Sequence, residues 1–215
     1  MTKENIKLIC LDIDGTIITQ NSWYTLNMAL GLSHEEDQEM YDAYGAGTLS
    51  YEGWIAKLVE LYKKYGKATK ETVVAALTGY TFIEGTEALV ADLQAKGYEV
   101  VLVSGSFQLL AEDIAKKLNI KTFKGNTEII FDENDVVENL TVGGDEPVAK
   151  LRYLKEIADA RNIPLSAIAC IGDGFTDIPL FEATGSGITF THSKPNVQAA
   201  AAQVVEKLSD ISTIL

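Results

Sequence analysis

The chain has 215 residues, of which 47% are hydrophobic and 23% charged. This composition is typical of a soluble globular protein with one domain, or one domain with a modest insert, and it excludes a wholly disordered chain. Acidic residues number 31 against 18 basic ones, and the resulting net charge of −13 repels nucleic-acid backbones and anionic membrane surfaces. We therefore expect neither a nucleic acid nor a membrane as a partner.

Two further features of the chain indicate a cytoplasmic location. No apolar run approaches the roughly 20 residues that span a bilayer, and the N-terminus lacks the pattern of a signal peptide. The two cysteines, Cys10 and Cys170, each lie inside an apolar run, which favours buried, reduced thiols. We expect a cytoplasmic protein that is a monomer or a homodimer.

Four short apolar runs predict the strands of a parallel sheet. They lack polar alternation, as do strands that are buried on both faces. The runs lie at residues 8–11, 100–103, 167–171 and 187–190. Stretches with helical spacing lie between them, at residues 86–96, 108–118 and 148–161. This order of strands and helices predicts a doubly wound, mostly parallel, Rossmann-like α/β sheet.

Two segments depart from this alternation. Residues 17–84 have helical apolar spacing and many aromatic residues, which predicts a small helical insert after the first strand. Residues 126–142 hold two β-rich runs around the turn-forming sequence DEND, which predicts a β-hairpin. The alanine-rich residues 199–202 are expected in the middle of a C-terminal helix.

Acidic side chains follow two of the predicted strands. Asp12 and Asp14 follow the first strand, and their carboxylates are expected on one side because alternate residues of a strand point the same way. Asp173, after a later strand, can complete a carboxylate cluster with them, since open α/β sheets gather ligands at the carboxyl ends of strands. A Mg²⁺ ion would relieve the repulsion within this cluster. Taken alone, the first pair is also compatible with a solvated acidic turn.

Groups that suit an anion follow the second predicted strand. The Ser104 hydroxyl and the backbone N–H of Gly105 or Ser106 can donate hydrogen bonds to a phosphate. Lys150, on the helix before the third strand end, could neutralise its charge. By itself this lysine is more typical of a solvent-exposed helix face, and only its place between the second and third strand-end motifs favours a role at the site.

The motifs occur in a known order. DIDGT at residues 12–16, Ser104 within VSGS, then Lys150, then GDGFTD at residues 172–177 follow the motif order of the haloacid dehalogenase superfamily. Over essentially its whole length the chain resembles the phosphoserine-phosphatase-like branch, whose helical cap lies between the first two motifs. A β-hairpin near the active site fits this resemblance. The implied domains are a core at residues 1–16 and 85–215 and a helical cap at residues 17–84.

The resemblance implies a covalent mechanism. Asp12 would attack phosphorus and form an aspartyl-phosphate. Asp14 would protonate the leaving alcohol and then activate water, and this second aspartate favours phosphate chemistry over dehalogenation. The Mg²⁺ ion would be held by Asp12, by the backbone carbonyl of Asp14 and by Asp173.

The remaining core motifs would serve the phosphoryl group and its surroundings. By the same resemblance, Ser104, the Gly105 amide and Lys150 would hold the transferring oxygens. Asp177 would orient Lys150 or support the metal site, and Thr16 would form hydrogen bonds within the first loop.

The substrate contacts differ from those of phosphoserine phosphatases, in which a cap glutamate binds the amine and a cap arginine the carboxylate. Asn21 lies near the expected glutamate, and the only arginines, Arg152 and Arg161, lie beyond the predicted cap. Thr176 stands where the branch often has asparagine. Aromatic side chains either form the core of the insert or line the substrate pocket. These candidates are Trp23, Tyr24, Tyr44, Tyr51 and Trp54.

We therefore expect a Mg²⁺-dependent phosphomonoester phosphatase that acts on a small soluble metabolite other than phosphoserine. Three alternatives stay open at this point. The protein could be a phosphoserine phosphatase after all, a phosphotransferase that uses an alcohol as acceptor, or a non-catalytic protein that binds a phosphorylated ligand.

Overall fold

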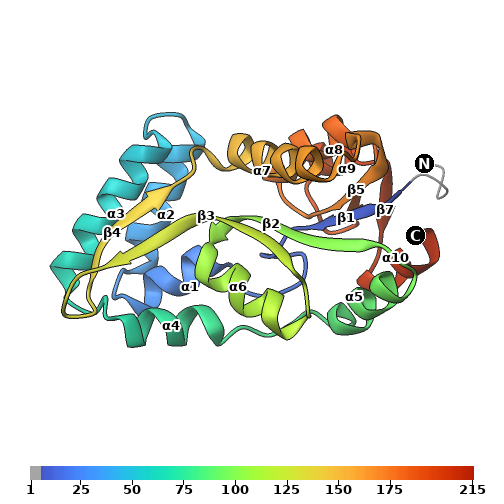
Figure 1. Ribbon diagram of the computed structural model, residues 1–215. Helices are drawn as coiled ribbons and strands as arrows, with labels where there is room; N and C mark the ends of the chain where they lie inside the picture. The colour runs from blue at the N-terminus through green and yellow to red at the C-terminus, as the bar shows by residue number, and fades with distance from the viewer. Residues whose placement is uncertain (1–5) are drawn as a thin grey trace.

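A computed structural model describes residues 6–215 as a seven-stranded sheet with helices on both faces (Figure 1). The strand order is β4-β3-β2-β1-β5-β6-β7. All neighbouring strands are parallel except β3 and β4, which form an antiparallel pair. The strands are β1 (Leu8–Leu11), β2 (Glu99–Phe107), β3 (Thr122–Phe131), β4 (Val137–Val142), β5 (Ile168–Ile171), β6 (Gly187–Phe190) and β7 (Gln203–Val205).

The central strand β1 shows why these segments form a doubly wound sheet. It pairs with β2 on one side and β5 on the other, and each of its residues is buried. Leu8 and Cys10 belong to one hydrophobic cluster, whereas Ile9 and Leu11 belong to the other. Alternate residues thus face opposite layers, which is why the strand is apolar without interruption.

The helices of the core cover the two faces of the sheet. One layer consists of α7, α8 and α9, and the other of α5, α6 and α10 (Figure 1). Their bounds are α5 (Thr86–Ala95), α6 (Gln108–Lys117), α7 (Glu146–Arg161), α8 (Ile178–Thr184), α9 (Pro195–Ala200) and α10 (Leu208–Ile214). Two short 3₁₀ turns, η2 (Leu165–Ala167) and η3 (Phe175–Asp177), flank β5.

Residues 17–84, called the insert below, form four helices at one end of the sheet (Figure 1). These are α1 (Ser22–Ala29), α2 (His34–Gly45), α3 (Tyr51–Tyr65) and α4 (Lys70–Thr78). Hydroxyl side chains cap the starts of α2, α3 and α4, as helix N-termini favour. The two ends of the insert run side by side, because Ile18 and Phe82 form a β-bridge.

The hairpin of β3 and β4 reaches from the sheet to the insert. Val136 forms a β-bridge with Thr69, and the N–H of Val137 donates to the carbonyl of Ala68 at 2.8 Å. Strand β4 also packs against α3. One hydrophobic cluster includes side chains of the sheet and of the insert, so the two regions share a core.

The structure confirms the predicted fold class, including the helical segment after the first strand and the hairpin. The expectation for residues 199–202 was wrong, because α9 ends at Ala200 and Ala201 is already extended. The N–H of Ala202 donates to the carbonyl of Gly187, which draws the chain onto the sheet edge where β7 follows. The division into core and cap domains stays a prediction. Among residues 6–215 no helix is long and apolar enough to cross a membrane.

Candidate active site

The loop after β1 brings its acidic residues against the end of β5. The N–H of Asp12 donates to the carbonyl of Ile171 at 2.9 Å, which extends the sheet by one residue. Gly15 has φ +70°, and a Cβ there would lie 2.4 Å from Oδ2 of Asp173. Only glycine therefore permits this turn and this close approach. Thr16 donates its hydroxyl to Oδ1 of Asp173 at 2.8 Å, as its predicted place in the first loop suggests.

The end of β2 is irregular. Its pairing with β3 shifts register between Ser104 and Phe107. Such an irregularity changes the direction of the side chains between these two residues. Ser104, Gly105 and Ser106 are all buried. The N–H of Ser106 donates to the Ser104 hydroxyl at 3.1 Å, so the two residues form a tight turn at the floor of the site.

The segment after β5 folds back on itself around Asp177. A Cβ at Gly172 would lie 2.2 Å from the carboxyl carbon of Asp177, so the packing there requires glycine. The N–H of Gly174 donates to Oδ2 of Asp177 at 3.1 Å. This arrangement buries Asp177 and directs its other oxygen toward α7.

Lys150 of α7 is fully buried at the centre of the site. Its ammonium nitrogen lies 2.9 Å from Oδ1 of Asp12 and 2.5 Å from Oδ1 of Asp177. It also donates to the Thr176 hydroxyl at 3.3 Å. Burial opposes the charge, but the two carboxylates outweigh it and raise the pKa of the Lys150 ammonium. The lysine is therefore charged, and it is not a solvent-exposed helix residue.

Three carboxylates lie close enough to share a cation. One oxygen each of Asp12, Asp173 and Asp177 lies within 4.8 Å of the other two. Burial, together with the charge of Asp12, raises the pKa of Asp173. An ion with a preference for oxygen ligands, such as Mg²⁺, suits such a group because it offsets the repulsion that burial makes costly. The donor set therefore fits the metal that the sequence implies.

Asp14 lies outside this close group. The Ser22 hydroxyl donates to its Oδ2 at 2.5 Å, and Oδ1 has no hydrogen-bond partner among the described residues. Burial raises the pKa of Asp14 to about 7, while the bond from Ser22 lowers it and the charge of Asp12 raises it. The Ser22 hydroxyl also bonds that of Ser106, which joins the insert to the end of β2.

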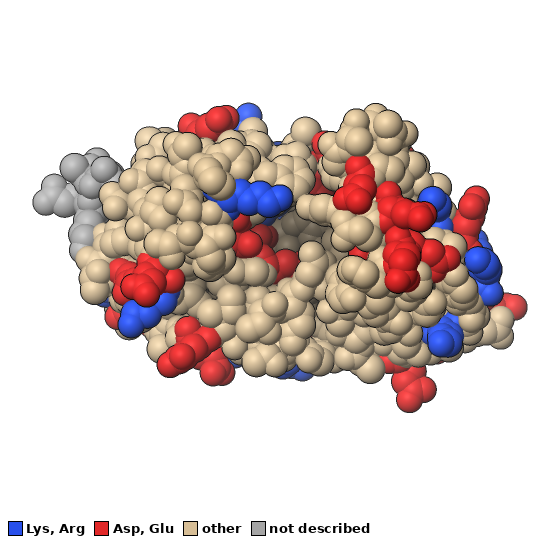
Figure 2. Space-filling model, turned by 180° about the vertical axis from the view of Figure 1, so that it is seen from behind, with Lys and Arg blue, Asp and Glu red and all other residues tan. Residues whose placement is uncertain are grey.

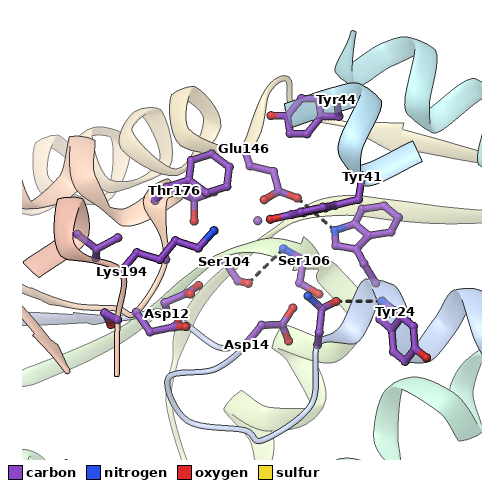
Figure 3. A pocket seen from close by; sticks show the side chains of 18 of the residues that line it. Asp12, Asp14, Tyr24, Tyr41, Tyr44, Ser104, Ser106, Glu146, Thr176 and Lys194 are labelled. Carbon is purple, nitrogen blue, oxygen red and sulfur yellow. Dashed lines mark hydrogen bonds between the residues drawn. The ribbon is translucent and has the colours of Figure 1, made fainter. Parts of the chain in front are cut away.

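These groups face a cavity of about 410 Å³ between the strand ends and the insert. Figure 2 shows a hollow in the middle of one face, with acidic side chains inside it and a basic side chain at its edge. Figure 3 shows Asp12, Asp14, Ser104 and Glu146 around one space. The insert contributes one side, called the insert wall, which consists of Asn21, Trp23, Tyr24, Asp37, Tyr41, Tyr44 and Trp54.

The predicted substrate residues fall into two groups. Asn21, Trp23, Trp54 and Thr176 line the cavity. Tyr51 is not among the lining residues, and it is only 3% exposed. The side chain of Asn21 caps α1 by accepting the N–H of Tyr24 at 2.9 Å.

Glu146, at the start of α7, is the main lining residue that the sequence analysis missed. Its Oε1 accepts from the Trp23 indole at 3.2 Å and from the Tyr51 hydroxyl at 3.4 Å. Burial raises the pKa of Glu146 to about 8; Lys150 lowers this pKa, and Asp14 and Asp12 raise it further. Its position on the same helix as Lys150, one turn earlier, was the signal available in the sequence.

Further lining residues were also missed. Asp37, Tyr41, His192, Ser193 and Lys194 lie at the cavity outside every motif, and Phe175 lies there within the motif at residues 172–177. Lys194 precedes α9 and reaches over Asp12 in Figure 3. Among the described residues it is the only lysine or arginine that lines the cavity.

The family of haloacid dehalogenase-like hydrolases matches residues 9–182. That range covers most of the chain, so the chain belongs to this family. Several curated relatives are named phosphoserine phosphatase. The one from Methanocaldococcus jannaschii is 29% identical over 216 residues, which cover 97% of this chain and 96% of the relative. The one from Streptomyces coelicolor is 29% identical over 91% of this chain, but the chain spans only 46% of that relative.

Solved structures give the same result. One described as a phospho-aspartyl intermediate analogue of phosphoserine phosphatase matches with a TM-score of 0.81 and 27% identity, covering 98% of this chain and 99% of that chain. A substrate-bound phosphoserine phosphatase complex matches with a TM-score of 0.81 and 26% identity, covering 98% of both chains. The resemblance to the phosphoserine-phosphatase-like branch is confirmed, and so is the class of enzyme, a phosphatase of the haloacid dehalogenase type.

Proposed function

We propose that the protein is a Mg²⁺-dependent phosphomonoester phosphatase that acts on a small soluble metabolite through an aspartyl-phosphate intermediate. The observation that carries the proposal is the contrast between two neighbouring carboxyl groups. Asp12 is paired with the Lys150 ammonium at 2.9 Å, whereas the Asp14 carboxyl group, among the described residues, is bonded only by the neutral hydroxyl of Ser22. One group thus faces a cation, and the other, whose pKa burial raises to about 7, can carry a proton.

Asp12 is the proposed nucleophile. The ion pair with Lys150 fixes its Oδ1, so the other oxygen, Oδ2, is the one left to approach phosphorus. In the first step this oxygen forms a bond to phosphorus while the bond from phosphorus to the substrate oxygen breaks. The phosphoryl group is then attached to Asp12 and the alcohol leaves.

Asp14 is the proposed acid and base. A carboxyl group with a pKa of about 7 can give or take a proton near neutral pH. Ser22 holds Oδ2, so Oδ1 is the atom available to protonate the departing alkoxide. The resulting carboxylate then removes a proton from the water that hydrolyses the aspartyl-phosphate.

The oxygens of the transferring phosphoryl group need donors and positive charge. We propose Ser104 and the Gly105 amide as donors from the end of β2, and Lys150 as the cation behind Asp12. Such groups act most strongly when they are fixed and shielded from water. Lys150 meets that condition, because it is fully buried and held by two carboxylates.

A Mg²⁺ ion would be held by Asp12, Asp173 and the backbone carbonyl of Asp14, with Asp177 as a further oxygen donor. When bound, it supplies charge that offsets the repulsion between the Asp12 carboxylate and the phosphate. The close approach of three carboxylates supports this part of the proposal. Thr16 orients Asp173 by its hydrogen bond, and Asp177 orients Lys150.

Phosphoserine is the second candidate substrate, because the curated relatives named above are phosphoserine phosphatases. Against it stands the insert wall, which contains no lysine or arginine that could bind a carboxylate. Nothing in the site favours transfer to an alcohol acceptor. The intact pair of Asp12 and Asp14 disfavours a non-catalytic protein.

We also propose that the protein works in the cytoplasm. Its two cysteines are buried and unpaired, as in a reducing compartment. Whether it is a monomer or a homodimer stays a prediction.

The test is release of inorganic phosphate from a generic aryl phosphate and from a panel of phosphorylated metabolites. We expect release with Mg²⁺ and its loss with a chelator, restored by excess Mg²⁺. Activity that is unchanged after complete removal of divalent metals would contradict the proposed metal dependence. No phosphate release from any phosphomonoester, with metal supplied, would contradict the proposed function.

A further inference from the structure

The part of the cavity that would hold the leaving group has an unusual balance of charge. The insert wall contains one acidic residue, Asp37, and no basic residue. Glu146 adds a second carboxylate from α7. Asp37 is bonded by the amide of Asn27 at 2.6 Å, which is a neutral partner. The region beyond the phosphoryl site therefore has two acidic groups and no cation of its own, and a cationic ligand beside Glu146 would favour the ionised form of its carboxyl group.

Glu146 is held in place by neutral donors. Its Oε1 accepts from Trp23 and Tyr51, and among residues 6–215 it forms no ion pair. Its Oε2 lies directly above Gly105, since a Cβ there would be 2.6 Å away. The carboxylate is thus fixed beside the proposed phosphoryl site, where the first atoms of a leaving group would pass.

Trp23, which donates to this carboxylate, belongs to a cluster of aromatic rings. The ring centres of Trp23 and Trp54 are 5.4 Å apart, and those of Tyr44 and Trp54 are 5.5 Å apart and stacked. Faces of such rings attract a cation within about 6 Å of their centres. A carboxylate beside tryptophan and tyrosine rings is the chemistry that recognises an ammonium group.

Lys194 lies at the other end of the cavity. In Figure 3 its ammonium group reaches over Asp12, on the side away from Tyr24 and Tyr41. It can therefore offset charge at the phosphoryl end, and it leaves the insert wall without a cation. A carboxylate on the leaving group would find no cation on the insert wall and acidic groups at Asp37 and Glu146, which disfavours its binding.

We propose that the enzyme prefers phosphomonoesters whose alcohol carries an ammonium group and no carboxylate, with the ammonium held between Glu146 and the rings of Trp23 and Trp54. This inference rests on the proposed function, and it gives that function a substrate class, the phosphates of amino alcohols.

The experiment compares three substrates of similar size. Propyl phosphate has a neutral alcohol, phosphoethanolamine adds an ammonium group, and phosphoserine adds a carboxylate as well. We expect kcat/KM to be highest for phosphoethanolamine and to exceed that for propyl phosphate by about tenfold to a hundredfold, the effect of one charge-assisted bond. A value for phosphoserine equal to or above that for phosphoethanolamine would overturn the inference.

Glu146→Gln tests the role of the carboxylate. The amide keeps the size and an acceptor oxygen for Trp23, but it loses the charge. We expect the ratio of kcat/KM between phosphoethanolamine and propyl phosphate to fall to near one. This ratio does not depend on the fraction of folded enzyme. An unchanged ratio, or loss of both activities together, would count against the inference.

The matched control is Glu156→Gln, on the exposed face of the same helix, where Glu156 pairs with Arg152. We expect this variant to keep the wild-type ratio. An aryl phosphate separates the two levels of the proposal. If it is hydrolysed with Mg²⁺ but the ammonium substrate has no advantage, the substrate class is wrong and the phosphatase stands. If nothing is hydrolysed, the proposed function itself fails.

Discussion

The loops that follow β1, β2 and β5, called the strand-end loops, face the same cavity as the insert wall. The two regions differ in whether their acidic side chains have a cationic partner. In the loops, charges are matched within the protein: Lys150 pairs with Asp12 at 2.9 Å and with Asp177 at 2.5 Å. In the wall, Asp37 is held by a neutral amide, and Glu146 of α7, beside the wall, is held by the neutral donors of Trp23 and Tyr51. The first region thus has a cation of the protein among its carboxyl groups, whereas the second has acidic groups and no cation.

This difference separates chemistry from selectivity. A paired and buried network keeps a fixed geometry, which is what a reacting phosphoryl group requires. A wall of aromatic rings and unpaired carboxylates discriminates among leaving groups by charge and shape. The loops thus suit phosphomonoesters in general, and the wall decides which of them bind well.

The largest expected effect is that of Asp12→Asn. The amide cannot form the aspartyl-phosphate, so we expect kcat to fall by about a thousandfold or more on every substrate. Steady-state phosphate release measures it. Substantial residual turnover by this variant would place the nucleophile elsewhere and remove the main distinction between the two regions.

Asp14→Asn tests the proposed acid role of a second residue in the strand-end loops. We expect kcat to fall by about a hundredfold to ten-thousandfold for an alkyl phosphate, because the alkoxide leaves without a proton. The loss should be smaller for an aryl phosphate, whose leaving group needs less protonation. Equal losses on both substrates would show that Asp14 does not protonate the leaving group.

Lys150→Met tests the matched charges of the loops. Removal of the ammonium leaves the buried carboxylates of Asp12 and Asp177 without their cation. We expect the free energy of unfolding to fall by roughly 3–5 kcal/mol, as measured by urea denaturation without metal. Double replacement by Lys150→Met and Asp177→Asn should recover part of this loss. If Lys150→Met left the free energy of unfolding unchanged, the ion pairs of Lys150 with Asp12 and Asp177 would not stabilise the folded protein.

The motifs at the strand ends could be predicted from the sequence because each depends on a short, local pattern. Asp12 follows a buried strand, Gly15 permits the turn, and the order of motifs places Lys150. The role of Tyr51 and the presence of Glu146 in the cavity could not be predicted in this way. Their contact joins α3 to α7, and only the packing of the insert on the core produces it.

Two further positions depend on tertiary contacts. Asp177 is expected from the resemblance to orient Lys150 or to support the metal site, and its place in the close carboxylate group depends on how η3 turns back, which no spacing rule gives. The alanine-rich residues 199–202 have high helix propensity, but a backbone hydrogen bond from Ala202 to the edge strand overrides it. Tertiary contacts determined both outcomes.

The smallest expected effect concerns pH and the insert wall. The pKa of Glu146 is raised from 4.5 to about 8 in the metal-free protein, so the folded state binds its proton more tightly than the unfolded state. The contribution of Glu146 to the free energy of unfolding therefore falls as pH rises from about 4.5 to about 8. Glu146→Gln should lack this decline.

Urea denaturation at a series of pH values, with a chelator present, measures the difference between this variant and the wild type. We expect the variant to gain stability relative to the wild type as pH rises through that range, and Glu156→Gln to show no such trend. If the free energy of unfolding had the same dependence on pH in Glu146→Gln and in the wild type, the pKa of Glu146 would not be raised in the folded protein.

The most direct test of the account is intact-mass spectrometry of the protein after rapid acid quench during turnover with Mg²⁺. We expect a species heavier by one phosphoryl group in the wild type, its attachment mapped to Asp12 by peptide analysis, and no such species in Asp12→Asn. Rapid turnover without any phosphorylated protein, or with the phosphoryl group on another residue, would contradict the covalent role of Asp12.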